Sequence, residues 1–364
     1  MRGDVTAWQG SIVVRTNCFD ESLAFYVEEV GFKLQSIFPA DAPANAVLQG
    51  ADLTVTLLAD EGACPVELDI EVPALSNGET RTLIAPEGSV LKMRADTQML
   101  SMPPLAQSLV VSAFDSGAAW HRGRAGMLYR DLLPEREGGR FIASHIRIPD
   151  GGPVPDYVHY HHVRFQMIYC HRGWVKVVYE DQGPPLTMYP GDCVLQPPGI
   201  RHQVLEASEG LEVVEIGTPA EHFTHVDHEL ALPTEALSPQ REFGGQQFVF
   251  HQAQAANWDA AAMVGFEASD LGLNAATRGV ASVKVQRYQS GLETEPFEVA
   301  GEFCFFFVLG GSACLNVGPA TYTLSEGAAC AIPAASQACF TNCDSAFAVL
   351  EVLLPGRHDH QTTN

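Results

Sequence analysis

The chain consists largely of short apolar runs separated by clusters of Gly and Pro. The runs are rich in Val, Ile, Phe, Tyr and Leu, and the clusters include EDQGPP, YPGD, QPPG and LGGSA. β-Branched and aromatic residues favour strands, and Gly and Pro mark the turns between them. The pattern predicts a mainly β protein with antiparallel barrels. The best helical segment is 21–31, with Asp20 as its cap and Gly31 as its stop.

The chain repeats itself from about residue 120 onward, at an offset of about 137 residues. Trp120 matches Trp258, and YPGDCVLQPPG at 189–199 matches SEGAACAIPAA at 325–335. A period of this length is that of a duplicated domain and too long for a solenoid repeat. The sequence therefore predicts two copies of one β-domain, over 98–230 and 231–364, joined in the polar, Pro-containing stretch at the start of the second.

The first 97 residues belong to neither copy and predict a strand, a helix and three further strands. These elements are SIVVRT, ESLAFYVEEVG, KLQSIFPA, NAVLQGA and LTVTLLA. The order resembles one half of the vicinal-oxygen-chelate fold of glyoxalases and extradiol dioxygenases. A shrunken second half would begin at PVELDIEVPAL and close with the hairpin RTLIAPEGSVLKMRA. The resemblance implies a small α+β domain over 1–97 that lacks the metal ligands of that family.

Three histidines and one amide in the first copy have the spacing of a metal site. His159 and His161 are two apart, so on a strand both imidazoles point to the same face. Gln166 follows, and His202 ends the segment GDCVLQPPGIRH. These segments resemble the two cupin motifs, which are His-x-His followed by a carboxylate or its amide, and Gly-x5-Pro-x-Gly-x2-His.

The resemblance to cupins implies a jelly-roll barrel that binds a divalent ion, either Fe, Mn, Ni or Zn, through His159, His161, Gln166 and His202. Gln166 stands where the family usually has Glu, so the site has one negative charge fewer. The alternative is that these are ordinary core polar groups, as in cupins that have lost their metal. Imidazoles buried without a ligand would leave polar atoms unpaired at a cost of ~1–3 kcal/mol each, which favours metal binding.

Three further side chains are candidates for catalysis beside the metal. Strand alternation from Gln166 places Arg164 on the inward face. Arg147 and Tyr157 are weaker candidates. For an arginine, a salt bridge at the barrel rim is at least as good an interpretation as a clamp for a substrate carboxylate.

The second copy has lost the ligand set. In the sequence alignment of the two copies, the four ligand positions are held by Pro296, Glu298, Phe303 and Ala338. The second copy is therefore predicted to be a metal-free structural barrel in which Phe303 fills the core.

Charge and composition limit the partners. The net charge is −23, from 44 acidic against 21 basic residues, and would repel nucleic acids and anionic membranes. No run reaches the ~18 apolar residues of a membrane span, and the N-terminus lacks a secretory pattern. The nine cysteines are scattered and odd in number, which favours reduced thiols. We expect a cytoplasmic protein with a small-molecule substrate and no nucleic-acid or membrane partner, and the sequence also allows a homodimer.

The leading functional hypothesis is a metal-dependent cupin enzyme acting on a small, oxygen-rich and anionic substrate. Tandem cupins with one intact site resemble ring-cleaving dioxygenases and β-diketone or flavonol oxygenases, so a dioxygenase is preferred. The motif with Gln166 in place of Glu also resembles that of small cupins that isomerise or open sugar acids. A non-catalytic small-molecule sensor and a storage protein are the alternatives outside enzymology.

Overall fold

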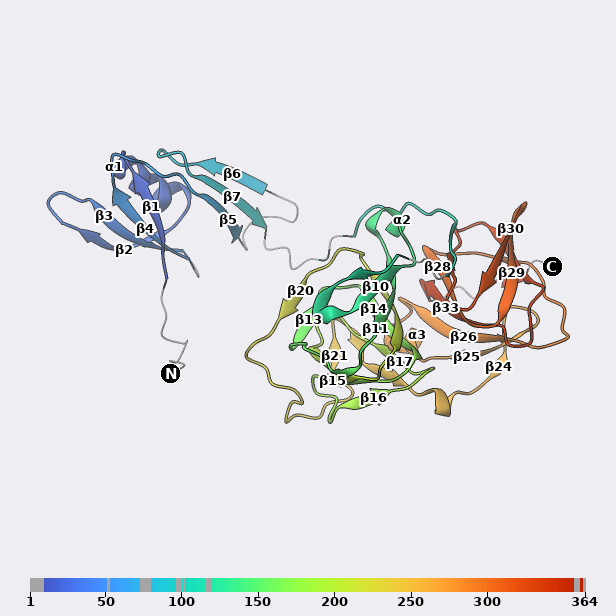
Figure 1. The fold of residues 1–364 in the computed structure, drawn as a ribbon. Coiled ribbons are helices and arrows are strands. Elements are labelled where there is room, and N and C mark those ends of the chain that lie inside the picture. The colour runs from blue at the N-terminus through green and yellow to red at the C-terminus, as the bar shows by residue number, and fades with distance from the viewer. Residues whose placement is uncertain are drawn as a thin grey trace. The chain divides into compact units, whose positions relative to one another are not determined.

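The computed structural model describes residues 10–50, 53–72, 80–95, 100, 102–114, 119–356 and 361–362 (Figure 1). The chain divides into two compact units, Met1–Met99 and Leu100–Asn364. Strands dominate both units, as the sequence predicts. Within the described residues, no helix is long and apolar enough to cross a membrane. All nine cysteines are free thiols.

The N-terminal unit begins with the predicted order of one strand, a helix and three strands. These elements are β1 (Ile12–Thr16), α1 (Phe19–Ala24), β2 (Lys33–Phe38), β3 (Asn45–Gln49) and β4 (Thr54–Ala59). The sheet has the order β1-β4-β3-β2, with β1 parallel to β4. Alternate residues of β3 and β4 point inward, so Ala46, Leu48, Val55 and Leu57 form a core with the aromatic face of the helix.

The helix differs from its prediction at the N-terminal end. It begins at Phe19 after Cys18, which makes no side-chain capping bond, so Asp20 lies in the first turn and is not the cap. The helix continues as a π-helical turn over Phe25–Glu29. Gly31, at φ +90°, ends it as expected, because a left-handed residue is inexpensive only for glycine.

A separate three-stranded sheet follows in the same unit, with the order β5-β7-β6. Its strands are β5 (Glu67–Val72), β6 (Thr80–Ile84) and β7 (Val90–Ala95). β6 and β7 form the hairpin expected from RTLIAPEGSVLKMRA. In the vicinal-oxygen-chelate fold a helix would follow β5, but the sequence is too short for one before β6. The segment between these strands, 73–79, lies outside the described residues.

The first barrel, green to yellow in Figure 1, consists of two facing antiparallel sheets. The larger sheet contains β9 (His121–Arg122), β10 (Leu128–Asp131), β11 (Ile142–Ile148), β14 (Phe165–Arg172), β17 (Cys193–Leu195), β19 (Leu211–Thr218) and β23 (Val249–His251). The smaller sheet contains β12 (Gly152–Pro153), β13 (His159–His161), β15 (Val175–Tyr179), β16 (Leu186–Met188), β18 (His202–Ala207) and β20 (Thr224–Val226).

The second barrel, orange to red in Figure 1 apart from β8, has the same architecture. Its larger sheet contains β8 (Val110–Ser112), β24 (Asp259–Ala260), β25 (Phe266–Asp270), β26 (Ser282–Tyr288), β28 (Phe303–Gly310), β31 (Ala329–Ala331) and β33 (Ala348–Leu354). Its smaller sheet contains β27 (Phe297–Glu298), β29 (Ser312–Val317), β30 (Ala320–Ser325), β32 (Gln337–Thr341) and β34 (Gln361–Thr362). This unit also contains two short α-helices, α2 (Arg136–Gly139) and α3 (Leu273–Ala276), two 3-10 helices, η3 (Arg124–Gly126) and η4 (Ala253–Ala255), and the hairpin of β21 (Glu242–Phe243) and β22 (Gln246–Gln247).

The two barrels exchange edge strands across the boundary predicted at residues 230 and 231. β8 precedes the first barrel in the chain but pairs with β31 of the second. β23 follows the predicted start of the second barrel but pairs with β17 of the first. Each barrel therefore contains a strand from the other's side of the boundary, because pairing with a neighbouring sheet satisfies an edge that would otherwise be exposed.

The larger sheets of the two barrels pack face to face through their outward residues. On β14, Phe165, Met167 and Tyr169 point outward, and on β28, Phe303 and its alternate neighbours do the same. The rings of Phe141 and Phe303 stack with centroids 4.2 Å apart. Phe303 is therefore buried between the barrels, and not inside the second barrel as predicted.

Three of the four ligand-equivalent positions of the second barrel lie one residue from the sequence alignment, whereas Ala338 keeps its place. Phe297 pairs with Ala338, as His159 pairs with His202. The same register places Val299 at the position of His161 and Cys304 at that of Gln166, because Phe303 matches outward-facing Phe165. Phe297, Val299, Cys304 and Ala338 are buried in one apolar cluster. Glu298, expected in the place of a ligand, is exposed on the other face of its strand.

Candidate metal centre

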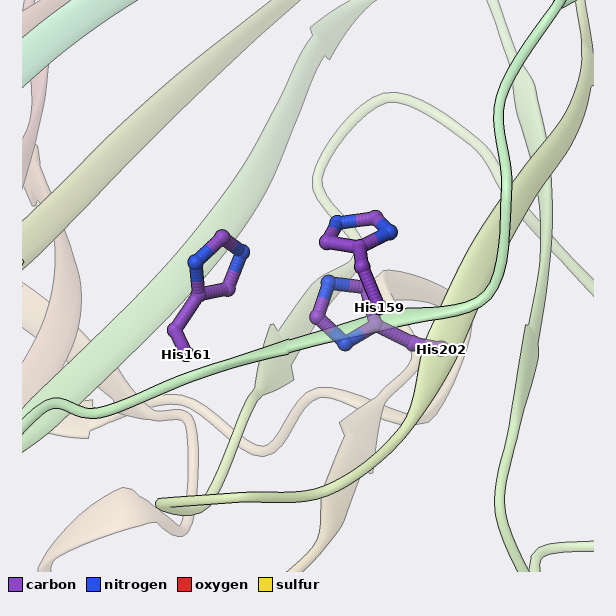
Figure 2. A group of neighbouring side chains, drawn as sticks. All are labelled: His159, His161 and His202. Carbon is purple, nitrogen blue, oxygen red and sulfur yellow. The ribbon is translucent and has the colours of Figure 1, made fainter. Parts of the chain in front are cut away.

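Two paired strands of the first barrel bring the three predicted histidines together. His159 and His161 lie on β13, and His159 is the direct cross-strand partner of His202 on β18. The ring centroids of His159 and His202 are 4.2 Å apart. Figure 2 shows the three imidazoles together. One nitrogen from each of the three rings lies within 4.8 Å of the others. This is the convergence that a chelate needs.

Hydrogen bonds at Nδ1 orient each ring. The Nδ1 atoms of His159 and His202 lie 2.8 Å and 3.0 Å from the carbonyl oxygens of Tyr157 and Ile200, to which they donate. The Nδ1 atom of His161 lies 3.1 Å from the hydroxyl of Thr224. A bond at Nδ1 leaves the Nε2 lone pair as the donor for a metal, the usual arrangement around imidazole ligands. The residues present therefore fit a divalent ion.

Burial lowers the pKa of all three imidazoles. Loss of hydration is the largest cause in each case, because it disfavours the charged ring. Arg124 adds to the effect at His159, and the neighbouring imidazoles add to it at His161 and His202. The rings are thus held in the neutral form, which is the form that binds a metal ion.

Gln166 lines the same cavity as the histidines and is held by a carboxylate. It lies on the inward face of β14 and is 1% exposed. Its Nε2 atom donates to Oε1 of Glu215 at 2.5 Å. Because the amide nitrogen is engaged in this way, the carbonyl oxygen is the atom that Gln166 can offer to a metal ion.

Arg124 is a cationic group in this cavity that the sequence analysis did not identify. One nitrogen of its guanidinium lies 3.0 Å from Nε2 of His159, and another forms an ion pair with the fully buried side chain of Asp156. The lone pair of His159 can bind either the guanidinium or a metal ion. A metal ion at this nitrogen would require Arg124 to release it, which would leave a positively charged donor inside the cavity.

The two predicted arginines lie elsewhere. Arg164 forms an ion pair with Glu302 of the second barrel, which also binds Arg140 at 2.8 Å. Arg164 precedes the first residue of β14, so strand alternation does not turn it inward. Arg147 alternates away from the cavity and binds Glu212 at 2.6 Å. These placements correct the expectation that either side chain points at the metal.

Tyr157 lies beside the histidines, and its backbone carbonyl orients His159. Its side chain is 41% exposed, and its ring meets that of His159 edge-on at 6.1 Å. The hydrogen bond between the two residues is made by the carbonyl oxygen of Tyr157, which accepts from Nδ1 of His159.

The histidines open onto a cavity of about 90 Å³ inside the barrel. A single water molecule needs ~10–15 Å³ by the same measure, so the cavity admits a small organic molecule. Tyr179 and Gln196 also line it, with Nε2 of Gln196 donating to the tyrosine hydroxyl at 2.9 Å.

One of the missed residues has a signal in the sequence. In LEVVEIGT, strand alternation places Glu215 on the same face as two apolar residues, and a carboxylate on an inward face indicates function. Arg124 follows a Gly in the turn HRGRAG, and nothing in that segment predicts which way its side chain points.

No family model and no curated protein match the chain. Among solved structures, a glyoxylate-induced protein from Pseudomonas aeruginosa, itself described as putative, is 14% identical, with a TM-score of 0.50 over 73% of this chain and 96% of that one. The oxalate decarboxylase of Lactobacillus farciminis, in a formate complex, is 13% identical, with a TM-score of 0.52 over 73% and 90%.

Bacillus subtilis oxalate decarboxylase, in a study of its Mn(II) centres, is also 13% identical, with a TM-score of 0.52 over 74% of this chain and 82% of that one. Likeness at this level of identity shows the fold. The two barrels of this chain therefore have the bicupin fold that the histidine motif and the internal repeat predicted.

Proposed function

We propose that the first barrel is the active site of a metal-dependent enzyme that acts on a small, oxygen-rich anion. The observation that carries the proposal is the convergence of three neutral imidazoles within 4.8 Å, in a cavity that also contains Arg124. When bound there, a divalent ion would supply Lewis acidity to a substrate oxygen or activate dioxygen. His159, His161, His202 and the oxygen of Gln166 would hold the ion.

The donor set suits borderline divalent ions, since imidazole nitrogen and neutral oxygen bind Fe, Mn, Ni and Zn alike. The Mn(II) centres of the similar B. subtilis structure support manganese among these four.

The charges in the cavity support an anionic substrate. Arg124 and Glu215 line the cavity with opposite charges, Asp156 adds a negative charge through its ion pair with Arg124, and the three imidazoles are neutral. A divalent ion would therefore leave this group with one excess positive charge, which an anion would neutralise. Arg124 can donate two parallel hydrogen bonds to a carboxylate once it has released His159.

Glu215 is the carboxylate among the described residues that line the cavity, and we assign it proton transfer. It lies half-buried beside Gln166, within reach of a substrate bound at the histidines. Exchange of its bond to Gln166 for a bond to substrate would allow it to accept or return a proton.

Two reaction classes fit this site. One barrel keeps the histidines and the other has lost them. This combination resembles tandem cupins that are dioxygenases, and so favours a dioxygenase. The names of the similar structures favour decarboxylation of a small acid without net oxidation. Glu215 is the group that a decarboxylase would need to protonate the resulting carbanion, so this second class has an observation of its own.

Gas exchange distinguishes the two classes. The protein loaded with Mn(II) or Fe(II) is incubated with catechols, β-diketones and 2-oxo or hydroxy acids, with and without oxygen. A dioxygenase consumes oxygen and stops without it, whereas a decarboxylase releases carbon dioxide without consuming oxygen. Failure of the metal-loaded protein to bind or convert any of these anions would contradict the proposal.

For the N-terminal unit, we propose a degenerate half of the vicinal-oxygen-chelate fold. The support is its strand, helix and three-strand order. We give it no catalytic role.

A further inference from the structure

The cavity of the first barrel is polar at one end and apolar at the other. On the smaller sheet, Tyr179 pairs with His202 at the metal-binding end. Two and four residues back along β15 come Val177 and Val175, and Val175 pairs with Met188 of β16. Four residues of strand span ~13 Å, so this wall becomes apolar away from the histidines.

The larger sheet repeats the gradient on the facing wall. In the pair formed by β14 and β19, Glu215 lies opposite Ile168, two residues along β14 from Gln166. Two and four residues back along β19 come Val213 and Leu211, which pair with Ile146 and Ile148 of β11. All of these side chains line the cavity. The two sheets therefore place their polar groups at the same end.

Among the described residues that line the apolar end, none offers a partner to a second charge. The charged groups that line the cavity, Arg124 and Glu215, are among the groups at the polar end. Four side chains at this end, Val175, Met188, Leu211 and Val213, are buried, and Val213 is the most exposed of them at 7%. A carboxylate placed among them would lose its hydration without gaining a hydrogen bond, which is strongly unfavourable. An alkyl group placed there would gain the free energy of leaving water.

We propose that the ligand of this site is a monoanionic chelating acid with a short apolar body, such as a 2-oxo or 2-hydroxy monocarboxylate. This inference rests on the proposed function, because the acid group binds at the metal and Arg124. It adds that the body of the molecule lies along Val175, Val177 and Val213. The gradient selects against dicarboxylates, whose second acid group would lie in the apolar end.

A series of 2-oxo acids tests the gradient on the unmodified protein. The protein is loaded with Zn(II), which has no redox chemistry, and dissociation constants are measured by calorimetry. Glyoxylate, pyruvate, 2-oxobutanoate and 2-oxopentanoate differ by single carbon atoms. Each added methylene should tighten binding about fourfold until the cavity is full. The matched pair is 2-oxopentanoate and 2-oxoglutarate, which share a five-carbon chain and differ in a terminal methyl or carboxylate.

We expect 2-oxopentanoate to bind at least roughly tenfold more tightly than 2-oxoglutarate. A flat series, or 2-oxoglutarate binding as tightly as 2-oxopentanoate, would overturn the inference. If glyoxylate and pyruvate bind only to the metal-loaded protein while longer chains gain nothing, the proposed function stands and the apolar-body inference falls. If the protein takes up no metal, both fall.

Substitution locates the effect within the cavity. Val213→Thr keeps the shape of the side chain and places a hydroxyl in the apolar end. It should weaken 2-oxopentanoate at least roughly threefold and leave glyoxylate unchanged. The control is Val308→Thr, the same change in the buried core of the second barrel. An equal loss for both ligands, or the same loss in the control, would contradict the placement of the apolar body along Val213.

Discussion

At the scale of single residues, the chemistry of the site depends on which groups are charged. The imidazoles are held neutral by burial, and Gln166 adds a neutral oxygen in place of a carboxylate. The negative charge lies one step away on Glu215, where it orients the amide without reducing the charge at the metal. A bound ion would therefore remain strongly electrophilic.

Replacement of Gln166 by Glu tests this division of charge. We expect Gln166→Glu to keep or tighten metal binding, because a carboxylate is a stronger ligand for a cation. Anionic ligands should bind more weakly, since the variant neutralises the excess positive charge. Calorimetry with metal and then with pyruvate measures both effects. If the variant binds and converts an anion as well as the parent protein does, the amide does not tune the site.

Glu137 gives a second prediction at this scale, outside the site. Its side chain is 1% exposed, its Oε2 atom has no hydrogen-bond partner, and burial followed by the charge of Glu302 raises its pKa to about 7. Between pH 4.5 and 7, the Glu137 carboxyl therefore keeps its proton in the folded state and loses it in the unfolded state. Stability falls as pH rises from 4.5 through 7.

Glu137→Gln should remove this pH dependence. We expect it to stabilise the protein by on the order of 1–3 kcal/mol at pH 8 and to have little effect at pH 4.5, where the native carboxyl is already protonated. Denaturant unfolding at the two pH values measures the difference. The control is Glu135→Gln, a change in an exposed neighbour. An equal effect at both pH values would show that the pKa of Glu137 is the same in the folded and unfolded states, and that burial does not raise it.

At the scale of elements, the hydrophobic pattern predicted which segments are strands but not the register of the second barrel. FCFFFVL is apolar at every position, so alternation cannot tell its inward face from its outward face. Both faces are buried, one inside the barrel and one against the first barrel. The histidine strands are different, because the polar ligands themselves mark which face points inward.

Phe303 tests the packing between the barrels. Phe303→Ala should cost ~3–5 kcal/mol, because it removes a fully buried ring that stacks on Phe141, and should leave metal content unchanged. Denaturant unfolding and elemental analysis measure the two quantities. The control is Phe223→Ala, at a ring that is 70% exposed. Loss of metal without loss of stability would place Phe303 in the site and contradict this role.

At the scale of the whole molecule, the internal repeat predicted two barrels but not the exchange of β8 and β23. A repeat fixes which segments correspond, whereas the pairing of an edge strand depends on which sheet lies nearest in the folded chain. Arg124 was missed for a similar reason, since a turn residue some distance before His159 reaches the cavity only through the closure of the barrel. The convergence of His159, His161 and His202 was predictable because each histidine lies in a motif of fixed spacing, although His202 is distant in the chain.

Truncation tests this organisation. A chain that begins at Leu100 contains the whole second unit, and we expect it to fold and to bind metal as the full chain does. A chain that begins at Phe114 lacks β8, which covers Cys330 and Ala331 of β31. We expect it to melt at a lower temperature, because an apolar edge strand loses its partner. Equal melting temperatures for the two truncated chains would argue against strand exchange.

The central claim is that His159, His161 and His202 hold one divalent ion, and elemental analysis of protein purified without affinity metal tests it most directly. We predict one equivalent of metal per chain, lost in His159→Ala and in His202→Ala and retained in His228→Ala, which removes an exposed imidazole. Circular dichroism confirms that each variant is folded. Full metal occupancy in both His159→Ala and His202→Ala would contradict the account.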